Sequence, residues 1–308
     1  MIGRLTHYLK KAKIEYRKGG VLKLIPKGAH FLFRRKFFLD FIVEALEYQI
    51  FSRFRNIRST ILEIPIQKEI TGHRLILYAS YDPESKISSC VMKQLQFFHQ
   101  EAYQIIFIST SPRFTKEEAD KIKDWVTIAI HRKNLGYDFA SWKLGYTFIM
   151  PNTRELESLI LLNDSCEGPE FELTEILKKM RSFPQAVYGI SKSMEIAEHI
   201  QSYFYHFGKG LLNDGIVEDF FKRIRILTSK WGVVRFLEIG SSKWLIKKGI
   251  SLKALIDPME PAVSEKMSQF DLTEPTREPL ASEWVRLKIS PFYKKSNLKE
   301  KCNEKTHH

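Results

Sequence analysis

Short apolar runs alternate, in the middle of the chain, with stretches in which apolar residues recur every three or four positions. The runs Arg74–Ser80, Gln104–Ser109 and 126–130 are typical of buried strands. Helical spacing follows the first run, and a stretch with Thr115 as its N-cap and acids in its first turn follows the second. This strand and helix alternation predicts an α/β fold with mostly parallel pairing and right-handed crossovers.

A fourth apolar run, at 158–162, has the length and branching of a strand buried on both faces. It stops abruptly at three polar residues, Asn163, Asp164 and Ser165, and Gly168-Pro169 then turns the backbone. A carboxylate is thereby held at the carboxyl end of a central strand. Ligands of open α/β sheets bind at that edge, where a short acid can reach a metal, a ribose or a phosphate-bound cation.

A second polar stretch, 132–143, lies between the third and fourth predicted strands. Gly136 permits a tight turn, and Asp138 is placed to cap or begin the next helix. Taken locally, Asp138 is an ordinary N-cap. Because both Asp138 and Asp164 follow strands of one parallel sheet, we expect them to emerge on the same edge. The cations of this stretch lie where a diphosphate could be neutralised.

The later part of the chain has a weaker pattern. We expect helices at 173–180, 215–226 and 244–256, and strands at 186–190, 199–207 and 233–238. The strand candidate 199–207 is rich in aromatic residues and predicts a pocket wall or an acceptor shelf. Residues 257–283 contain four prolines and many acids, which predicts an extended wrapping segment, and the tail 298–308 is polar.

Charge is concentrated at the N-terminus. Residues 1–60 contain 14 basic and 4 acidic side chains, and so carry +10 of the formal net charge of +13. Aromatic and aliphatic residues are interleaved with these cations, a composition that suits an anionic membrane surface. A solvated helical hairpin packing on the main domain explains the pattern equally well. Nucleic acid is not an expected partner, since no recognised binding motif accompanies the charge.

Length and cysteine usage bound the class of protein. The 308 residues fit one large α/β domain with appendages, which we divide into a basic extension (1–70), a main domain (71–256) and a C-terminal segment (257–308). The three cysteines are widely spaced, which argues against a disulfide framework or a structural zinc site. Without a signal peptide or a long apolar run, a cytoplasmic location is expected, with peripheral attachment to the inner face of the plasma membrane as an extension of it.

Three motifs resemble those of the rhamnan synthesis protein F family, in order and at sensible spacing: Asn-Leu-Gly-Tyr-Asp-Phe-Ala-Ser-Trp-Lys at 134–143, Leu-Leu-Asn-Asp-Ser-Cys-Glu-Gly-Pro at 161–169 and His-Ile-Gln-Ser-Tyr-Phe at 199–204. Weaker matches follow at 238–242 and 289–295, so the resemblance covers about residues 73–300. Those proteins are glycosyltransferases of cell-surface polysaccharide assembly. Each motif is modestly specific, and the three together are much stronger.

The resemblance implies a GT-A-like nucleotide-binding fold and a nucleotide-sugar donor. In that picture Asp138 contacts the donor's sugar or ribose, and Asp164 takes the place of the metal-binding acid in a DxD motif. Here that motif has one carboxylate, which together with phosphate oxygens can still hold Mg²⁺ or Mn²⁺. The expected donor-binding residues are Asn134, Gly136, Asp138, Lys143, Asn163, Asp164 and Ser165. Arg132, Lys133 or Lys143 would support the leaving diphosphate.

An inverting transfer also needs a base that deprotonates the acceptor hydroxyl. Glu238 and His199 are the candidates, with Asp214 behind them. The predicted function is transfer of a sugar such as rhamnose to a polysaccharide or lipid-linked glycan. The alternative is a scaffold or sensor of the same fold without turnover, which the single carboxylate keeps open. The sequence does not encode the sugar, the acceptor, the stereochemistry or the oligomeric state.

Overall fold

The computed structural model describes residues 40–269, 276 and 280–294, and the chain divides into two units, 1–53 and 54–308. Within the first unit the described part is a helix over 40–49 that leads into a 3-10 turn, η2 (Phe51–Phe54). Its large apolar side chains are exposed: Phe41, Ile42, Val43, Leu46, Ile50 and Phe51. The predictions made for residues 1–39 and for the tail lie outside the described residues.

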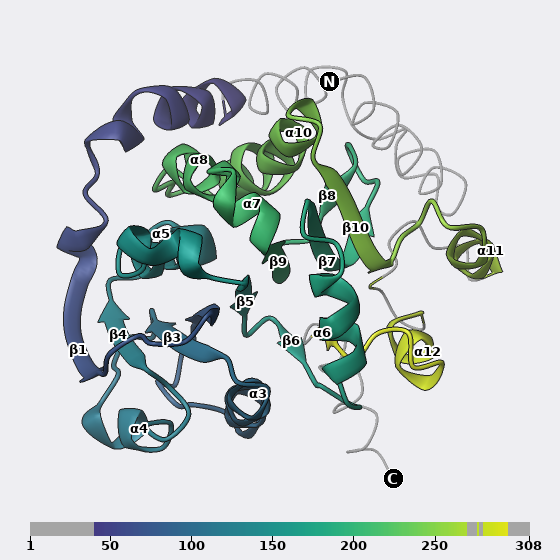
Figure 1. Cartoon of the computed structure of the whole chain (residues 1–308). Coiled ribbons are helices and arrows are strands. Elements are labelled where there is room, and N and C mark those ends of the chain that lie inside the picture. The colour runs from purple at the N-terminus through teal and green to yellow at the C-terminus, as the bar shows by residue number, and fades with distance from the viewer. Residues whose placement is uncertain (1–39, 270–275, 277–279, 295–308) are drawn as a thin grey trace, which may run out of the picture. The chain divides into compact units, whose positions relative to one another are not determined.

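The second unit is built on a mixed sheet whose described strands run in the order β1-β4-β3-β2-β5-β9-β7-β10, with β8 paired to β7 (Figure 1). Four neighbouring strands are parallel: β4 (Ile128–Arg132), β3 (Gln104–Ser109), β2 (Arg74–Ser80) and β5 (Ser158–Asn163). These are the four strands predicted from sequence, and their parallel pairing is confirmed. The central pair is in register along its whole length, so that Ala79 lies beside Asn163.

In the other half of the sheet, one strand of the main path runs against its neighbours. β9 (Phe204–Gly208) is antiparallel to both β5 and β7 (Ala186–Ser193), and β10 (Ser251–Ile256) is parallel to β7. β8 (His199–Ile200) pairs antiparallel with the end of β7. The sheet predicted as mostly parallel is therefore a mixed sheet: the aromatic stretch 199–207 supplies a strand that runs against β5 and β7, and those two strands run the same way as the four predicted ones.

The edge strand β1 (Ile61–Gln67) pairs antiparallel with β4, so the sheet begins inside the range assigned to the N-terminal extension. Its sequence hides it, since Pro65 interrupts the apolar pattern. A proline lacks the amide hydrogen that a central strand must donate, which confines it to edge strands and irregular pairings. The register of β1 against β4 is irregular on both sides of Glu63.

Helices cover both faces of the sheet (Figure 1). One face packs in a single apolar cluster with α3 (Ser89–Gln100), α4 (Lys116–Asp120) and α6 (Thr174–Arg181). On the other face, a row of aromatic rings joins α5 (Tyr137–Tyr146) to β9 and to α8 (Ile216–Arg223), which α7 (Lys209–Asn213) precedes. This two-sided cover buries the central strands completely and leaves the strand ends as the places for polar chemistry.

Several later elements differ from the sequence-based predictions. The stretch Val233–Glu238 is a π-helix, placed between α9 (Lys230–Gly232) and α10 (Ile239–Lys247), and not a strand. Of the helix expected over 244–256, only the first residues are helical, as the end of α10, and the last part forms β10. The C-terminal segment also folds: α11 (Pro261–Gln269) and α12 (Leu280–Arg286) share a small core around Trp284. In the described part of the chain, helices are too short or too polar to cross a membrane.

Candidate functional site

The strand order reverses beside β2: β3 and β4 follow it on one side, and β5 continues the sheet on the other. At such a switch point the two loops that leave the strands turn apart and open a crevice outside their carboxyl ends. Here those ends are Ser80 and Asn163. The sequence-predicted acid Asp164 therefore lies at the position in this sheet where a ligand site is expected.

Asp164 is tied to the neighbouring strand. Its Oδ2 accepts a hydrogen bond from the Ser80 hydroxyl at 2.9 Å and another from the Tyr81 backbone amide at 2.8 Å, and its own amide donates to the Ala79 carbonyl at 3.2 Å. These bonds fix the carboxylate while leaving it half-buried at the crevice. Sequence reasoning missed Ser80 and Tyr81, because their role follows from which strand pairs with β5.

The side chain of Asn163 holds the same turn by hydrogen bonds on both sides. Its Oδ1 accepts from the amide of Ser165 at 3.1 Å and from the hydroxyl of Ser165 at 2.5 Å. Its Nδ2 donates to Oδ2 of Asp138 at 2.8 Å and is 3.5 Å from the Ser202 carbonyl. The two acids predicted to share an edge are thus joined through one amide side chain.

Asp138 lies in the first turn of α5, and the loop before that turn is held by Gly136 and Arg132. Gly136 has φ +85°, and a Cβ there would lie 2.7 Å from Cβ of Ala140, so the turn requires glycine. The buried guanidinium of Arg132 donates to the carbonyls of Lys133, Leu135 and Tyr137 at 2.9, 2.9 and 3.0 Å. Burial lowers the pKa of Arg132 to about 10, and Asp138 opposes that shift. Arg132 therefore holds the loop, and its hydrogen bonds go to backbone carbonyls rather than to a diphosphate.

Electrostatics single out Asp138. Burial, and secondarily the negative charge of Asp164, raise its pKa to about 7, although the Asn163 amide and Arg132 act in the opposite direction and Glu238 adds to the rise. Two carboxylates that repel each other at a switch point are a costly arrangement unless a cation or a proton is shared there.

The two candidate bases lie together. Glu238, at the end of the π-helix, accepts from the Ser202 hydroxyl through Oε2 at 2.8 Å, and its Oε1 is 3.4 Å from Nε2 of His199. Nδ1 of His199 donates to the Ala197 carbonyl at 2.8 Å, so Nε2 can donate to Glu238 only when the imidazole is protonated. Single-turn π-helices occur frequently at functional sites. Ser202 links this pair to Asn163, which a local sequence pattern could not reveal.

The remaining predicted residues lie around this network. Asn134 is exposed on the loop between β4 and α5 that Arg132 holds. Lys143 is half-buried and donates to the Ile224 carbonyl at 2.6 Å, and burial lowers its pKa to about 8. Asp214 follows α7, which leaves β9 at the amino end of β5, so it belongs to the opposite edge of the sheet. In the stretch expected to form an acceptor shelf, 201–207, the aromatic side chains are buried, and Ser202 is half-buried.

The side chains of the site meet only part of what a divalent cation requires as ligands. Groups of three or more His, Cys, Asp or Glu side chains that could hold a metal are absent from the described ranges. Asp164 and Asp138 supply two carboxylates whose repulsion a cation would relieve. Magnesium commonly binds through one or two carboxylates and completes its shell with phosphate oxygens and water. The residues present therefore fit a cation that arrives with a phosphate ligand, and not a cage made by protein alone.

The C-terminal segment supports the turn that carries Asp164. The two-residue strand β6 (Cys166–Glu167) pairs antiparallel with β11 (Tyr293–Lys294), and the Glu170 amide donates to the Pro291 carbonyl at 2.9 Å. A Cβ on Gly168 would collide with that carbonyl. The weaker family match at 289–295 thus packs directly against the turn that follows Asp164.

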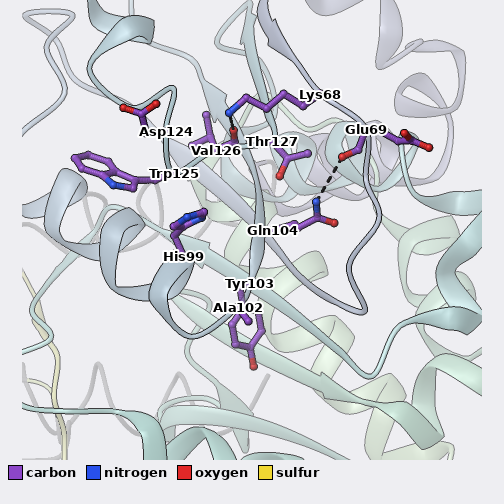
Figure 2. A pocket seen from close by; sticks show the side chains of 10 residues that line it. All are labelled: Lys68, Glu69, His99, Ala102, Tyr103, Gln104, Asp124, Trp125, Val126 and Thr127. Atoms are coloured by element: carbon purple, nitrogen blue, oxygen red, sulfur yellow. Dashed lines mark hydrogen bonds between the residues drawn. The ribbon is translucent and has the colours of Figure 1, made fainter.

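A separate hollow of about 260 Å³ opens at the amino ends of β3 and β4, where His99, Gln104 and Trp125 line it (Figure 2). Lys68 also lines it, and its Nζ donates to the Val126 carbonyl at 3.1 Å. Because this hollow lies at the opposite end of the parallel strands from Asp164, it is no part of the site.

The fold and site define an α/β protein with two carboxylates, Asp138 and Asp164, at the switch point of a mixed sheet. Residues 105–301 match the family described as rhamnan synthesis protein F. The match spans more than half of the chain, so this chain belongs to the rhamnan synthesis protein F family.

Two curated relatives are similar to part of this chain. The uncharacterized protein y4gN of Sinorhizobium fredii (strain NBRC 101917 / NGR234) is 26% identical over 196 residues, which cover 62% of this chain and 50% of the relative. The virulence protein VirA of Vibrio anguillarum (strain ATCC 68554 / 775) is 29% identical over 132 residues, 42% of each chain. The chain thus spans about half the length of the curated relatives it matches.

A solved structure with partial similarity is that of a candidate nucleotide-diphospho-sugar transferase from Desulfovibrio desulfuricans G20. It is 13% identical, covers 61% of this chain and 81% of its own, and superposes with a TM-score of 0.36.

Proposed function

We propose that this protein is a glycosyltransferase with a GT-A-like fold that moves a sugar from a nucleotide-sugar donor to a glycan. The observation that carries the proposal is the pair of mutually repelling carboxylates, Asp138 and Asp164, joined through Asn163 at the switch point of the sheet. Nucleotides bind at switch points of such sheets. Family membership supports the assignment and suggests rhamnose as the sugar.

Each end of the polar network has a role in this proposal. Asp164, with Asp138 beside it, would hold Mg²⁺ or Mn²⁺, and the cation would supply charge stabilisation of the leaving diphosphate. Tyr81 is exposed directly after β2, and we assign it to contact with the nucleoside. Asn134, Gly136, Lys143 and Ser165 border the donor.

Glu238 and His199 form the acceptor side. Either could take the proton of the acceptor hydroxyl, and their contact makes them one functional unit. The Ser202 hydroxyl orients the carboxylate by its hydrogen bond to Oε2.

The test is donor binding by the purified full chain. We expect one nucleotide sugar of a panel to bind, more tightly with Mn²⁺ than with a chelator, because a cation would offset the repulsion between the diphosphate and the two carboxylates. Isothermal titration measures the affinity, and free nucleoside monophosphate, which lacks the diphosphate, is the matched control. A well-folded protein that binds no nucleotide would favour the alternative, a scaffold or sensor of the same pathway without turnover.

We also propose that the N-terminal unit holds the enzyme against an anionic membrane, beside a lipid-linked acceptor on the inner face of the plasma membrane. The helix at 40–49 presents Val43, Leu46 and, beyond it, Phe51 to solvent, and residues 1–60 carry a formal +10. Apolar side chains together with basic ones are the composition that binds lipid interfaces.

Deletion of residues 1–53, the whole N-terminal unit, is expected to abolish sedimentation with vesicles that contain phosphatidylglycerol. Leu46→Asp should weaken binding about tenfold, because a buried leucine contributes on the order of 1.5 kcal/mol or more. Vesicles of phosphatidylcholine alone are the control for charge. Unchanged binding by the deleted protein would refute the membrane proposal.

A further inference from the structure

Two exposed aromatic side chains belong to the segments that carry Asp138 and Glu238. Tyr137, at the start of α5, is 39% exposed, and Trp231, in α9, is 56% exposed. Tyr137 directly precedes Asp138, and α9 continues without a break into the π-helix that ends at Glu238. One ring is thus attached to the donor side of the network and the other to the acceptor side. The aromatic stretch 201–207, by contrast, is buried.

The backbone holds Tyr137 in an unfavourable conformation. Its φ is +55°, directly after Gly136 at +85°, and a bulky residue with positive φ is a genuine outlier. The fold stabilises this conformation with the buried Arg132, whose Nη2 donates to the Tyr137 carbonyl at 3.0 Å. Local strain that the surrounding structure enforces is concentrated at ligand-binding sites. A strained residue whose side chain is nevertheless exposed indicates a ring that is positioned for something outside the core.

A hydrogen bond brings the two aromatic segments together. The Tyr137 hydroxyl donates to the Thr228 carbonyl at 3.5 Å, three residues before Trp231. Ser229 then caps α9, because its hydroxyl accepts from the Gly232 amide at 3.2 Å. The hydrogen bond ties the backbone at Thr228 to Tyr137, and the cap fixes the start of the short helix that carries Trp231.

We propose that Tyr137 and Trp231 form a binding subsite for a pyranose ring of the acceptor glycan. A pyranose has an apolar face of C–H groups and a polar rim of hydroxyls, and Tyr and Trp match it with an apolar ring face and one polar group. Exposed apolar patches rimmed by polar residues mark ligand grooves. The inference deepens the proposed function and rests on it, since it names where the acceptor of that same site binds.

The probe is a short rhamnose oligosaccharide titrated calorimetrically into the full chain without nucleotide. Trp231→Ala and Tyr137→Ala are expected to weaken its binding about tenfold each, because each removes one stacking face. Tyr137→Phe keeps the ring and should retain affinity within about twofold. Met150→Ala, which alters an exposed apolar side chain ahead of the amino end of β5, is the matched control and should have no effect.

Nucleotide-sugar affinity is measured on the same variants and should be unchanged. The inference is overturned if wild-type protein does not bind the oligosaccharide, if Trp231→Ala and Tyr137→Ala bind it like wild type, or if these variants lose the nucleotide sugar instead, which would assign the rings to the donor. If wild type binds the oligosaccharide through Trp231 but binds no nucleotide sugar, the transferase proposal fails while the subsite stands.

Discussion

Asp164→Asn is expected to reduce cation-assisted donor binding by at least about 100-fold, since even residues that only support a metal ligand change affinity by about 10- to 100-fold. The substitution removes the charge and keeps the shape. An amide oxygen can still accept from the Ser80 hydroxyl and the Tyr81 amide, the two bonds that fix the carboxylate. Folding stability should therefore change by no more than about 1 kcal/mol.

The measurement is a nucleotide-sugar titration with and without Mn²⁺, with thermal unfolding as the check on folding. Glu170→Gln is the matched control, because it removes an equal charge from an exposed side chain six residues further on. We expect Glu170→Gln to bind like wild type. If Asp164→Asn keeps the response to Mn²⁺, Asp164 is not a metal ligand, and the resemblance to a DxD motif is coincidental.

The parallel half of the fold could be predicted because its information is local. Each of the strands β2, β3, β4 and β5 is a short apolar run, and a helical pattern separates β2 from β3 and β4 from β5. Parallel strands place their carboxyl ends on one edge, so the prediction that Asp138 and Asp164 share an edge needed no tertiary knowledge. The structure places them there, with Asn163 between them.

The other half depended on pairing between distant residues. Val233–Glu238 contains two valines and a phenylalanine, which suit a strand, and only its packing as a continuation of α9 into α10 makes it helical. β10 was hidden inside the single helix predicted over 244–256. The contact of Ser202 with Glu238 joins residues 36 apart through the pairing of β9 with β5 and β7. Arg132 was expected to face a diphosphate, because its sequence position does not reveal that backbone carbonyls surround it.

Asp138→Asn is expected to stabilise the protein at neutral pH while it impairs donor binding. Burial and the charge of Asp164 raise the pKa of this carboxyl from 3.8 to about 7, so the folded state holds a proton that the unfolded state has released. Between those two values the folded chain binds more protons, and the free energy of unfolding therefore falls as pH rises through this window. Well above pH 7 the loss in the free energy of unfolding has reached its full value and no longer changes with pH.

The shift corresponds to roughly 4 kcal/mol at most, and to about 2 kcal/mol once the solvent that reaches this half-buried group is allowed for. An introduced amide carries no charge and can still accept the hydrogen bond from Nδ2 of Asn163. Urea unfolding of both proteins, with a chelator present, should show Asp138→Asn more stable by about 2 kcal/mol at pH 8 and nearly equal to wild type at pH 4. Glu170→Gln, at an exposed position, should show no such dependence on pH. A difference that is constant with pH, or a variant less stable at pH 8, would mean that Asp138 is not strained by its neighbours. The predicted trade of stability for function is typical of residues that a protein retains for a ligand.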